Sequence, residues 1–165
     1  MPIDEQFNIL YQNEKPENFD KFKIGIIGAG NIVKNSHLPI YIKENLKVSN
    51  IFDLSLEKAE NLKKIFKIDK FSKTLDEFFA DNNFDIVDVA VPAECNEELI
   101  SKVLNNNKNL LIQKPLANNI NSAKNIIEEY KEFNLKANVN HQMRYSPAIR
   151  AAKNILNNDY IGKLI

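Results

Sequence analysis

The chain is poor in the residues that build metal and disulfide sites, with one cysteine and two histidines among its 165 residues. A lone cysteine, Cys95, excludes an internal disulfide, and its neighbours Glu94 and Glu97 disfavour a thiolate, so we interpret it as chemically idle. The two histidines, His37 and His141, lie far apart in the sequence, and no cluster of Cys or Glu supplies further ligands. The sequence therefore predicts no metal site.

An excess of charge of either sign is also absent, since 22 Lys and Arg balance 22 Asp and Glu. Without a basic stripe, nucleic acid and anionic membrane surfaces are not expected partners. The first six residues lack the basic and apolar regions of a signal peptide, and no apolar run is long enough to span a membrane. We expect a cytoplasmic protein with one core, because 165 residues leave too little chain for a second.

The order of short apolar runs and helical patterns predicts an α/β fold, a doubly wound parallel sheet of the Rossmann type with helices on both faces. Residues 1–22 are polar and read as an N-terminal arm. The predicted strands are 23–27, 48–52, a short one near Phe71, 85–91, 109–113 and 136–140. The predicted helices are 31–44, 56–66, 75–80, 96–105, 122–133 and 147–156.

The first predicted strand runs directly into a glycine turn and a helix start, over residues 23–33. Gly28 allows a tight turn, Gly30 lets the backbone approach a pyrophosphate, and the helix N–H groups beyond it face the anion. Val33 stands where this pattern usually has Gly or Ala, so we expect the helix to pack slightly further from the strand. A tight turn that binds nothing would also explain two glycines.

An acid at the end of the second strand strengthens the dinucleotide hypothesis. Asp53 lies 20 residues beyond Val33, where a carboxylate can accept hydrogen bonds from the adenosine ribose. An N-cap for the following helix explains Asp53 equally well, and both roles are compatible. Because Asp53 would repel a 2′-phosphate and no Arg follows it, NAD is favoured over NADP.

Four motifs, in their order and spacing, carry a resemblance to a known family. Residues 22–165 resemble the N-terminal domain of the glucose-fructose oxidoreductase and inositol dehydrogenase family (Gfo/Idh/MocA). The motifs are GAGNI at 28–32 followed by HLP at 37–39, AVP at 90–92, QKPLA at 113–117 and MRYSP at 143–147.

The resemblance implies a nicotinamide cofactor and a set of residues that contact it. Lys114 matches a family lysine beside the nicotinamide and the substrate hydroxyl, where it stabilises an alkoxide or relays its proton, and Arg144 matches one that reaches back to the cofactor. Taken alone, Lys114 is an ordinary strand-end lysine and Arg144 a solvated cation. Val91, Pro92 and Asn96 are expected to lie along the cofactor toward its nicotinamide half. The full set of implied cofactor contacts is Gly28, Gly30, Asn31, Ile32, Asp53, Val91, Pro92, Asn96, Gln113, Lys114 and Arg144.

Two more expectations concern the same region. The resemblance implies a sharp turn that holds the lysine, so we expect a cis Lys114-Pro115 bond. His37, before Pro39 and at a break in the first helix, is either a structural hydrogen-bonding residue, which we favour, or one that faces a substrate cleft.

Members of the family continue into a second α/β domain that supplies the substrate pocket, the dimer surface and an Asp-x-x-x-His pair. We expect residues 23–158 to form the Rossmann-type domain and residues 159–165 to begin the truncated second one. The implied function is the cofactor-binding part of a sugar or polyol oxidoreductase that transfers hydride between NAD(P) and a secondary alcohol. A non-enzymatic NAD-binding or regulatory module, or half of a split enzyme, also fits. Self-association or a partner chain would then cover the missing domain's surface.

Overall fold

The structure is a computed structural model that describes residues 18–158 and 160–162. Residues 18–140 form one compact unit, here called the sheet unit. The described residues from 141 onward belong to a second unit, here called the C-terminal unit. Most of the predicted arm, residues 1–17, and part of the predicted start of a second domain, residues 159 and 163–165, lie outside the described residues.

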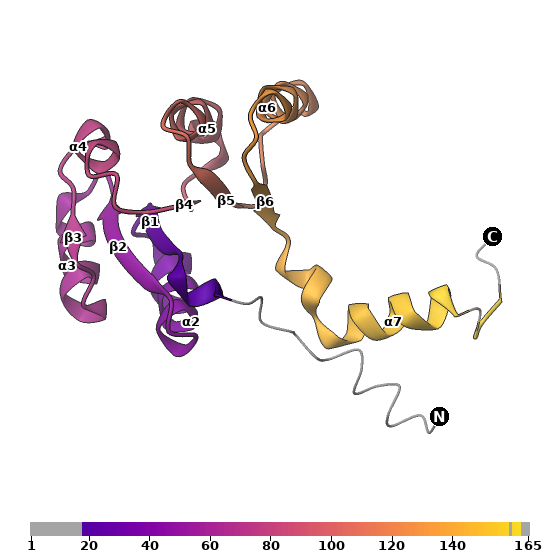
Figure 1. The fold of residues 1–165 in the computed structure, drawn as a ribbon. Coiled ribbons are helices and arrows are strands. Elements are labelled where there is room, and N and C mark those ends of the chain that lie inside the picture. Colours follow the sequence, from indigo (N-terminus) through magenta and orange to yellow (C-terminus); the bar gives the residue numbers. More distant parts are fainter. Residues whose placement is uncertain (1–17, 159, 163–165) are drawn as a thin grey trace. The chain divides into compact units, whose positions relative to one another are not determined.

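Six parallel strands build the sheet in the order β3-β2-β1-β4-β5-β6, which confirms the predicted doubly wound fold (Figure 1). The central strand β1 pairs with β2 on one side and β4 on the other, so the carboxyl ends of these three strands meet at one edge. The chain order reverses at this point, where open α/β sheets bind ligands. The strands are β1 (Lys23–Ile27), β2 (Lys47–Phe52), β3 (Lys70–Phe71), β4 (Ile86–Val89), β5 (Asn109–Gln113) and β6 (Ala137–Asn140).

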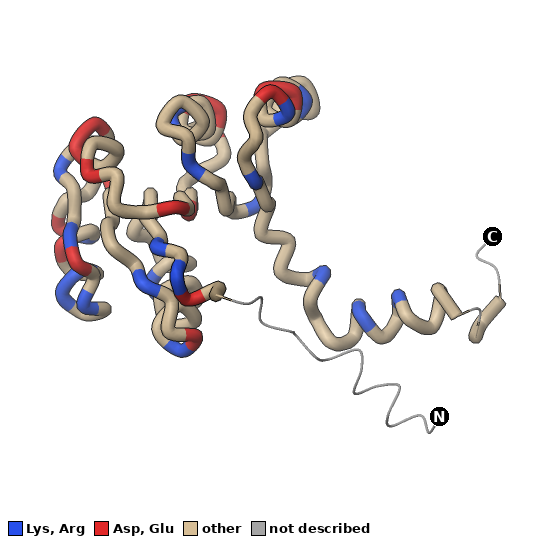
Figure 2. The backbone as a smooth tube through the Cα atoms, in the orientation of Figure 1, with Lys and Arg blue, Asp and Glu red and all other residues tan. Residues whose placement is uncertain are grey.

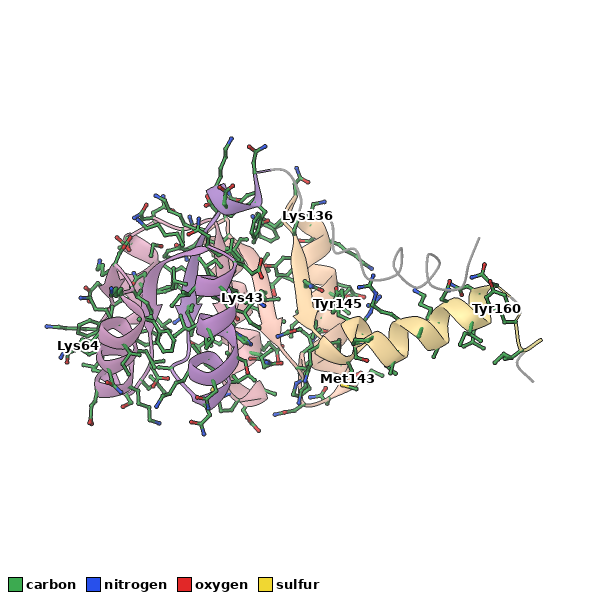
Figure 3. All side chains as sticks on the ribbon, turned by 90° about the horizontal axis from the view of Figure 1, so that it is seen from below. Lys43, Lys64, Lys136, Met143, Tyr145 and Tyr160 are labelled. Carbon is green, nitrogen blue, oxygen red and sulfur yellow. The ribbon has the colours of Figure 1, made fainter. Side chains whose placement is uncertain are left out.

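Helices cover both faces of this sheet, with α2 and α3 on one side and α4, α5 and α6 on the other (Figure 1). Seen from below in Figure 3, the helices that carry Lys43 and Lys64 lie in front of the strands. The helices of the sheet unit are α2 (Leu38–Lys43), α3 (Leu56–Phe66), α4 (Leu75–Ala80), α5 (Asn96–Asn105) and α6 (Ile120–Glu132), with short turns η1 (Phe19–Lys21), η2 (Val33–His37) and η3 (Ala93–Cys95).

The core has two layers because side chains alternate across the strands. Ile26 on β1 packs in the cluster that includes residues of α2 and α3, and Ile27 packs in the cluster that includes residues of α4, α5 and α6. Gly25 lies where strand β1 and the cluster on the α4, α5 and α6 side are too close together for a side chain. A Cβ at this position would lie 2.7 Å from Cζ of Phe78, a ring that is fully buried. Close packing of an aromatic ring on the strand therefore requires glycine here.

A local polar contact explains the largest difference from the predicted helix ranges. Asn119 accepts hydrogen bonds from the N–H groups of Asn121 and Ser122, and this cap starts α6 two residues earlier than predicted. The helix after β1 begins as predicted, but Val33–His37 is a π-helix whose wider turn the apolar spacing did not reveal.

The C-terminal unit contains η4 (Gln142–Tyr145) and α7 (Pro147–Asn157). Ser146 caps α7 by accepting a hydrogen bond from the N–H of Ile149, and none of the α7 residues is buried. Basic side chains supply all the charge in the described part of this unit, as Figure 2 shows. None of the described helices combines the length and apolar character of a membrane span.

Candidate functional site

The glycine turn after β1 joins the ends of three strands. Gly28 has φ +114°, a conformation that favours glycine, and its N–H donates a 2.8 Å hydrogen bond to the carbonyl of Phe52. A Cβ on Gly28 would lie 2.4 Å from the carbonyl oxygen of Ala90. The predicted tight turn is confirmed, and it holds β1 against the ends of β2 and β4.

The next glycine faces open space. A Cβ on Gly30 would have no heavy atom of the described residues within 4 Å. The helix begins at Asn31, and the N–H of Lys34 is bonded to the carbonyl of Gly30 at 3.0 Å. The N–H groups of the first turn have no partner within the helix, and the helix dipole adds positive potential there. This end of the helix can bind an anion such as a pyrophosphate.

Asp53 ties the glycine loop to the end of β2. Its Oδ2 accepts a 2.7 Å hydrogen bond from the N–H of Ala29, and its Oδ1 accepts one of 2.7 Å from the N–H of Ser55. The residue at the N-cap position of α3 is Ser55, so the alternative interpretation of Asp53 as that cap is wrong. Asp53 is only half-buried, and each carboxylate oxygen has further acceptor capacity for ligand hydroxyls.

A cleft of about 510 Å³ opens beside this carboxylate, between the ends of β1, β2 and β4 and the start of α5. Its apolar walls include Leu54 and Val91, and Leu54 is 89% exposed. Cys95, which is free and exposed, and Glu98 also line it. A concave apolar surface next to a few polar groups is typical of a site for a planar organic ligand.

The loop after β5 carries Lys114, whose side chain is exposed. The Lys114-Pro115 peptide bond is cis, which confirms the prediction. Asn96 is 1% exposed, and its Nδ2 donates to the carbonyls of Pro115 and Leu116, each at 3.1 Å. Asn96 therefore supports this loop, and its direct contact with a cofactor stays a prediction.

A buried polar network lies beneath the same edge of the sheet. Nδ1 of His37 lies 2.7 Å from Oδ2 of Asp88 on β4, and the hydroxyl of Tyr41 donates to that oxygen at 2.8 Å. The structural hydrogen bond that we favoured for His37 is confirmed. Burial raises the pKa of the Tyr41 hydroxyl well above its usual range, and the Asp88 carboxylate raises it further.

The sequence interpretation did not single out Asp88. The available signal was an acid in the middle of an apolar strand, because a buried carboxylate requires partners.

Arg144 belongs to the C-terminal unit, where it lines a hollow of about 410 Å³ with Tyr145 of η4 and with Arg150 and other residues of α7. Figure 3 shows Tyr145 and Met143 at the start of this segment. The contact between Arg144 and a cofactor stays a prediction. Within the described residues, no group of three or more His, Cys, Asp or Glu side chains could hold a metal ion.

A parallel sheet in this strand order, with a glycine turn after β1 and an acid after β2, defines a dinucleotide-binding Rossmann fold. Residues 22–141 match the model of the Gfo/Idh/MocA proteins, described as "Oxidoreductase family, NAD-binding Rossmann fold". The chain belongs to this family, as the four motifs indicated.

The chain spans less than half the length of each of the following relatives. It is 31% identical over 134 residues to the uncharacterized protein YMR315W of Saccharomyces cerevisiae, which covers 79% of the chain and 38% of the relative. It is 26% identical to glucose-6-phosphate 3-dehydrogenase of Bacillus subtilis over 87% of the chain and 40% of the enzyme. It is 29% identical to scyllo-inositol 2-dehydrogenase (NAD(+)) of the same organism over 65% of the chain and 32% of the enzyme.

Solved structures share the fold. An oxidoreductase from Agrobacterium radiobacter, in complex with NAD+, superimposes with a TM-score of 0.80 at 22% identity, over 86% of this chain and 42% of that one. KijD10, a 3-ketoreductase from Actinomadura kijaniata in complex with NADP, gives a TM-score of 0.77 at 22% identity, over 86% of this chain and 44% of that one. Similar structures therefore include NAD and NADP complexes.

Proposed function

We propose that the sheet unit binds NAD in preference to NADP and is the cofactor-binding part of an oxidoreductase that acts on a secondary alcohol of a sugar or polyol. The observation that carries the cofactor preference is the position of Asp53, half-buried at the end of β2 and bonded to the glycine loop. This carboxylate can accept hydrogen bonds from two ribose hydroxyls but would repel a phosphate in place of one of them.

The surrounding surface fits the rest of a dinucleotide. The open space over Gly30 and the first-turn N–H groups of Asn31 and Ile32 suit the pyrophosphate. The cleft between Leu54 and the Val91-Pro92 segment adjoins Asp53, the proposed ribose ligand, so we assign it to the adenine ring and not to the nicotinamide half that the resemblance implied.

Two lysines near Gly30 would favour NADP, so they oppose the proposed preference for NAD. Lys34 and Lys58 line a hollow of about 350 Å³ together with Gly30, and both lysines are exposed. Their charges would partly offset the repulsion of a 2′-phosphate by Asp53. We propose that the carboxylate decides the preference, because its geometry is fixed by two backbone hydrogen bonds whereas exposed lysine side chains are mobile and screened.

Lys114 is the proposed catalytic residue. The bound cofactor would supply the hydride acceptor for oxidation of the alcohol. The ammonium of Lys114, at the end of β5, would stabilise the negative charge that develops on the substrate oxygen or help to relay its proton. Asn96 stabilises the loop that carries this lysine by donating two hydrogen bonds to its backbone.

The substrate class rests on the relatives and not on a pocket of this chain. One of them is named for oxidation of a sugar phosphate and another for oxidation of an inositol. We propose that a second α/β domain, in the same or another polypeptide, supplies the substrate pocket. The second candidate function is an NAD-binding or regulatory module without activity, which the open space over Gly30 and the carboxylate of Asp53 would serve equally well.

Calorimetric titration of the chain with NADH and with NADPH tests this proposal, followed by a screen of polyols and sugar phosphates for reduction of NAD. We expect NADH to bind more tightly than NADPH. Binding of neither cofactor would overturn the proposal, and tighter NADPH binding would overturn the stated preference. NADH binding without turnover by this chain supports the module or the need for a second domain, whereas turnover supports a catalytic unit.

A further inference from the structure

The buried network around His37 reaches the loop that carries Lys114. One side of the imidazole faces the carboxylate of Asp88, with Nδ1 2.7 Å from Oδ2. The other side faces two amides at the ends of β5 and β6. Nε2 lies 3.3 Å from Nε2 of Gln113 and 3.4 Å from Nδ2 of Asn140. The imidazole thus connects three neighbouring strands, β4, β5 and β6, near their carboxyl ends.

The orientation of Gln113 determines which protons this contact requires. Its Oε1 accepts a 2.9 Å hydrogen bond from the backbone N–H of Lys114, so its NH₂ group faces the imidazole. An NH₂ group can only donate, and Nε2 of His37 must then be an unprotonated acceptor. Nδ1 in turn carries the proton and donates it to Asp88.

The local fold presents the imidazole at this place. His37 is the last residue of the π-helix and is 6% exposed. A π-turn inserts an extra residue and changes the direction of the side chains that follow, and such turns occur often at functional sites. Tyr41 shares Oδ2 of Asp88 with His37, so two residues from one helical segment bind the same carboxylate oxygen.

We propose that His37 is a positioning residue: as a neutral Nδ1–H imidazole it holds the amide of Gln113, and Gln113 holds the backbone of Lys114. The catalytic relevance of this positioning rests on the function proposed above for Lys114. A second proton on the ring would place an N–H opposite the two NH₂ groups. Rotation of the Gln113 amide would relieve that conflict only by turning its NH₂ group toward the N–H of Lys114. The charge state of the ring and the position of the lysine are therefore coupled.

Among the described residues, the titratable groups in contact with the ring are Asp88 from β4 and Tyr41 from α2. Asn140 and Gln113 are neutral, so substitution of Gln113 by Glu introduces a charge with little change of shape. A carboxylate next to Nε2 requires a proton on that nitrogen. The negative charge of the carboxylate also favours the protonated ring electrostatically.

Long-range ¹H–¹⁵N spectra of the histidine rings test the proposal without a cofactor. In the unmodified chain we expect the His37 ring to carry its proton on Nδ1 at neutral pH. In Gln113→Glu we expect a proton on Nε2 of His37 as well, because a carboxylate can only accept a hydrogen bond from it, whereas the ring signals of the exposed His141 should be unchanged. An Nε2–H ring in the unmodified chain, or unchanged His37 ring signals in the variant, would overturn the proposal.

Hydrogen exchange at the backbone of Lys114 provides a second readout, using His37→Asn. The side-chain NH₂ of asparagine lies near the position of Nδ1 and can still donate to Asp88. The asparagine side chain is too short to reach Gln113. We expect exchange of the Lys114 N–H to become about tenfold faster, as for the loss of one ordinary hydrogen bond, with the thermal midpoint nearly retained. Unchanged exchange in a folded variant would contradict the role of His37.

These measurements separate this inference from the proposed function. If the ring and exchange results are as expected and NADH does not bind, the positioning of the loop stands and the cofactor proposal fails. If NADH binds and the spectra are unaffected by Gln113→Glu, the cofactor proposal stands and the positioning role fails.

Discussion

Substitution of Asp53 by Ala should weaken NADH binding more than it weakens NADPH binding. The carboxylate accepts 2.7 Å hydrogen bonds from the N–H groups of Ala29 and Ser55 and, in the proposed complex, from the adenosine ribose. Hydrogen bonds to a charged group contribute about 1.5–3 kcal/mol each. Loss of one such ribose bond should therefore lower NADH affinity by about 1.5–3 kcal/mol, which is roughly 10- to 150-fold.

The same substitution has a cost for folding that must be measured separately. Ala29 is 7% exposed, so its N–H would be left buried without an acceptor, at about 1–3 kcal/mol. Ser55 is less buried, and water can replace its partner at little cost. Urea unfolding should thus show a free energy of unfolding that is lower by about 1–3 kcal/mol. With a loss of this size we expect the variant to remain folded at low denaturant, where cofactor binding is measured.

Calorimetry with both cofactors decides the matter, and Glu128→Ala on the exposed side of α6 is a matched control. Removal of the Asp53 charge also removes the repulsion of a 2′-phosphate, so the ratio of NADH to NADPH affinity should fall. The reasoning is refuted if folded Asp53→Ala binds NADH within twofold of the unmodified chain.

Further predictions concern stability and assembly. The pKa of Tyr41 is raised by burial and by Asp88, so below its unfolded value of 10.0 its contribution to stability is complete. Above about pH 10 the free energy of unfolding should fall by up to about 1.4 kcal/mol per pH unit for this group, and Tyr41→Phe should remove that part of the slope in urea unfolding. Gly25→Ala should destabilise the sheet unit by about 1–3 kcal/mol, because the added methyl meets the ring of Phe78 at 2.7 Å, and a wild-type denaturation midpoint would contradict this. Since no residue of α7 is buried and Ile149 is 48% exposed, we expect self-association through the C-terminal unit, and light scattering that shows a monomer at high concentration would disprove it.

The fold was largely predictable because the signals are local and repeated. Buried strands such as 23–27 read as continuous apolar runs, and helices such as 56–66 show the apolar spacing of a covered face. Parallel strands need crossovers of one hand, so alternation of the two patterns predicts the sheet. The π-turn at Val33–His37 was not predictable in this way, since one inserted residue in a short helical segment changes the apolar spacing too little to be recognised.

The site was predictable where a residue acts through its own backbone or its place at a strand end. Gly28 and Asp53 are of this kind, because turn geometry and strand order fix what they face. Asn96 is different: its partners lie 19 and 20 residues further along the chain, and only the folded sheet brings them together. The same holds for the contact between His37 and Gln113, which are 76 residues apart.

The most direct test of the central claim is a map of backbone amide shifts in ¹H–¹⁵N spectra during titration with NADH. If the carboxyl edge of β1, β2 and β4 binds the dinucleotide, the largest shifts should fall at residues 29–32, 53–55 and 90–95. The amides along α6 should not move. Saturable binding whose shifts fall elsewhere, or the absence of any shift at the glycine turn with millimolar NADH, would contradict the account.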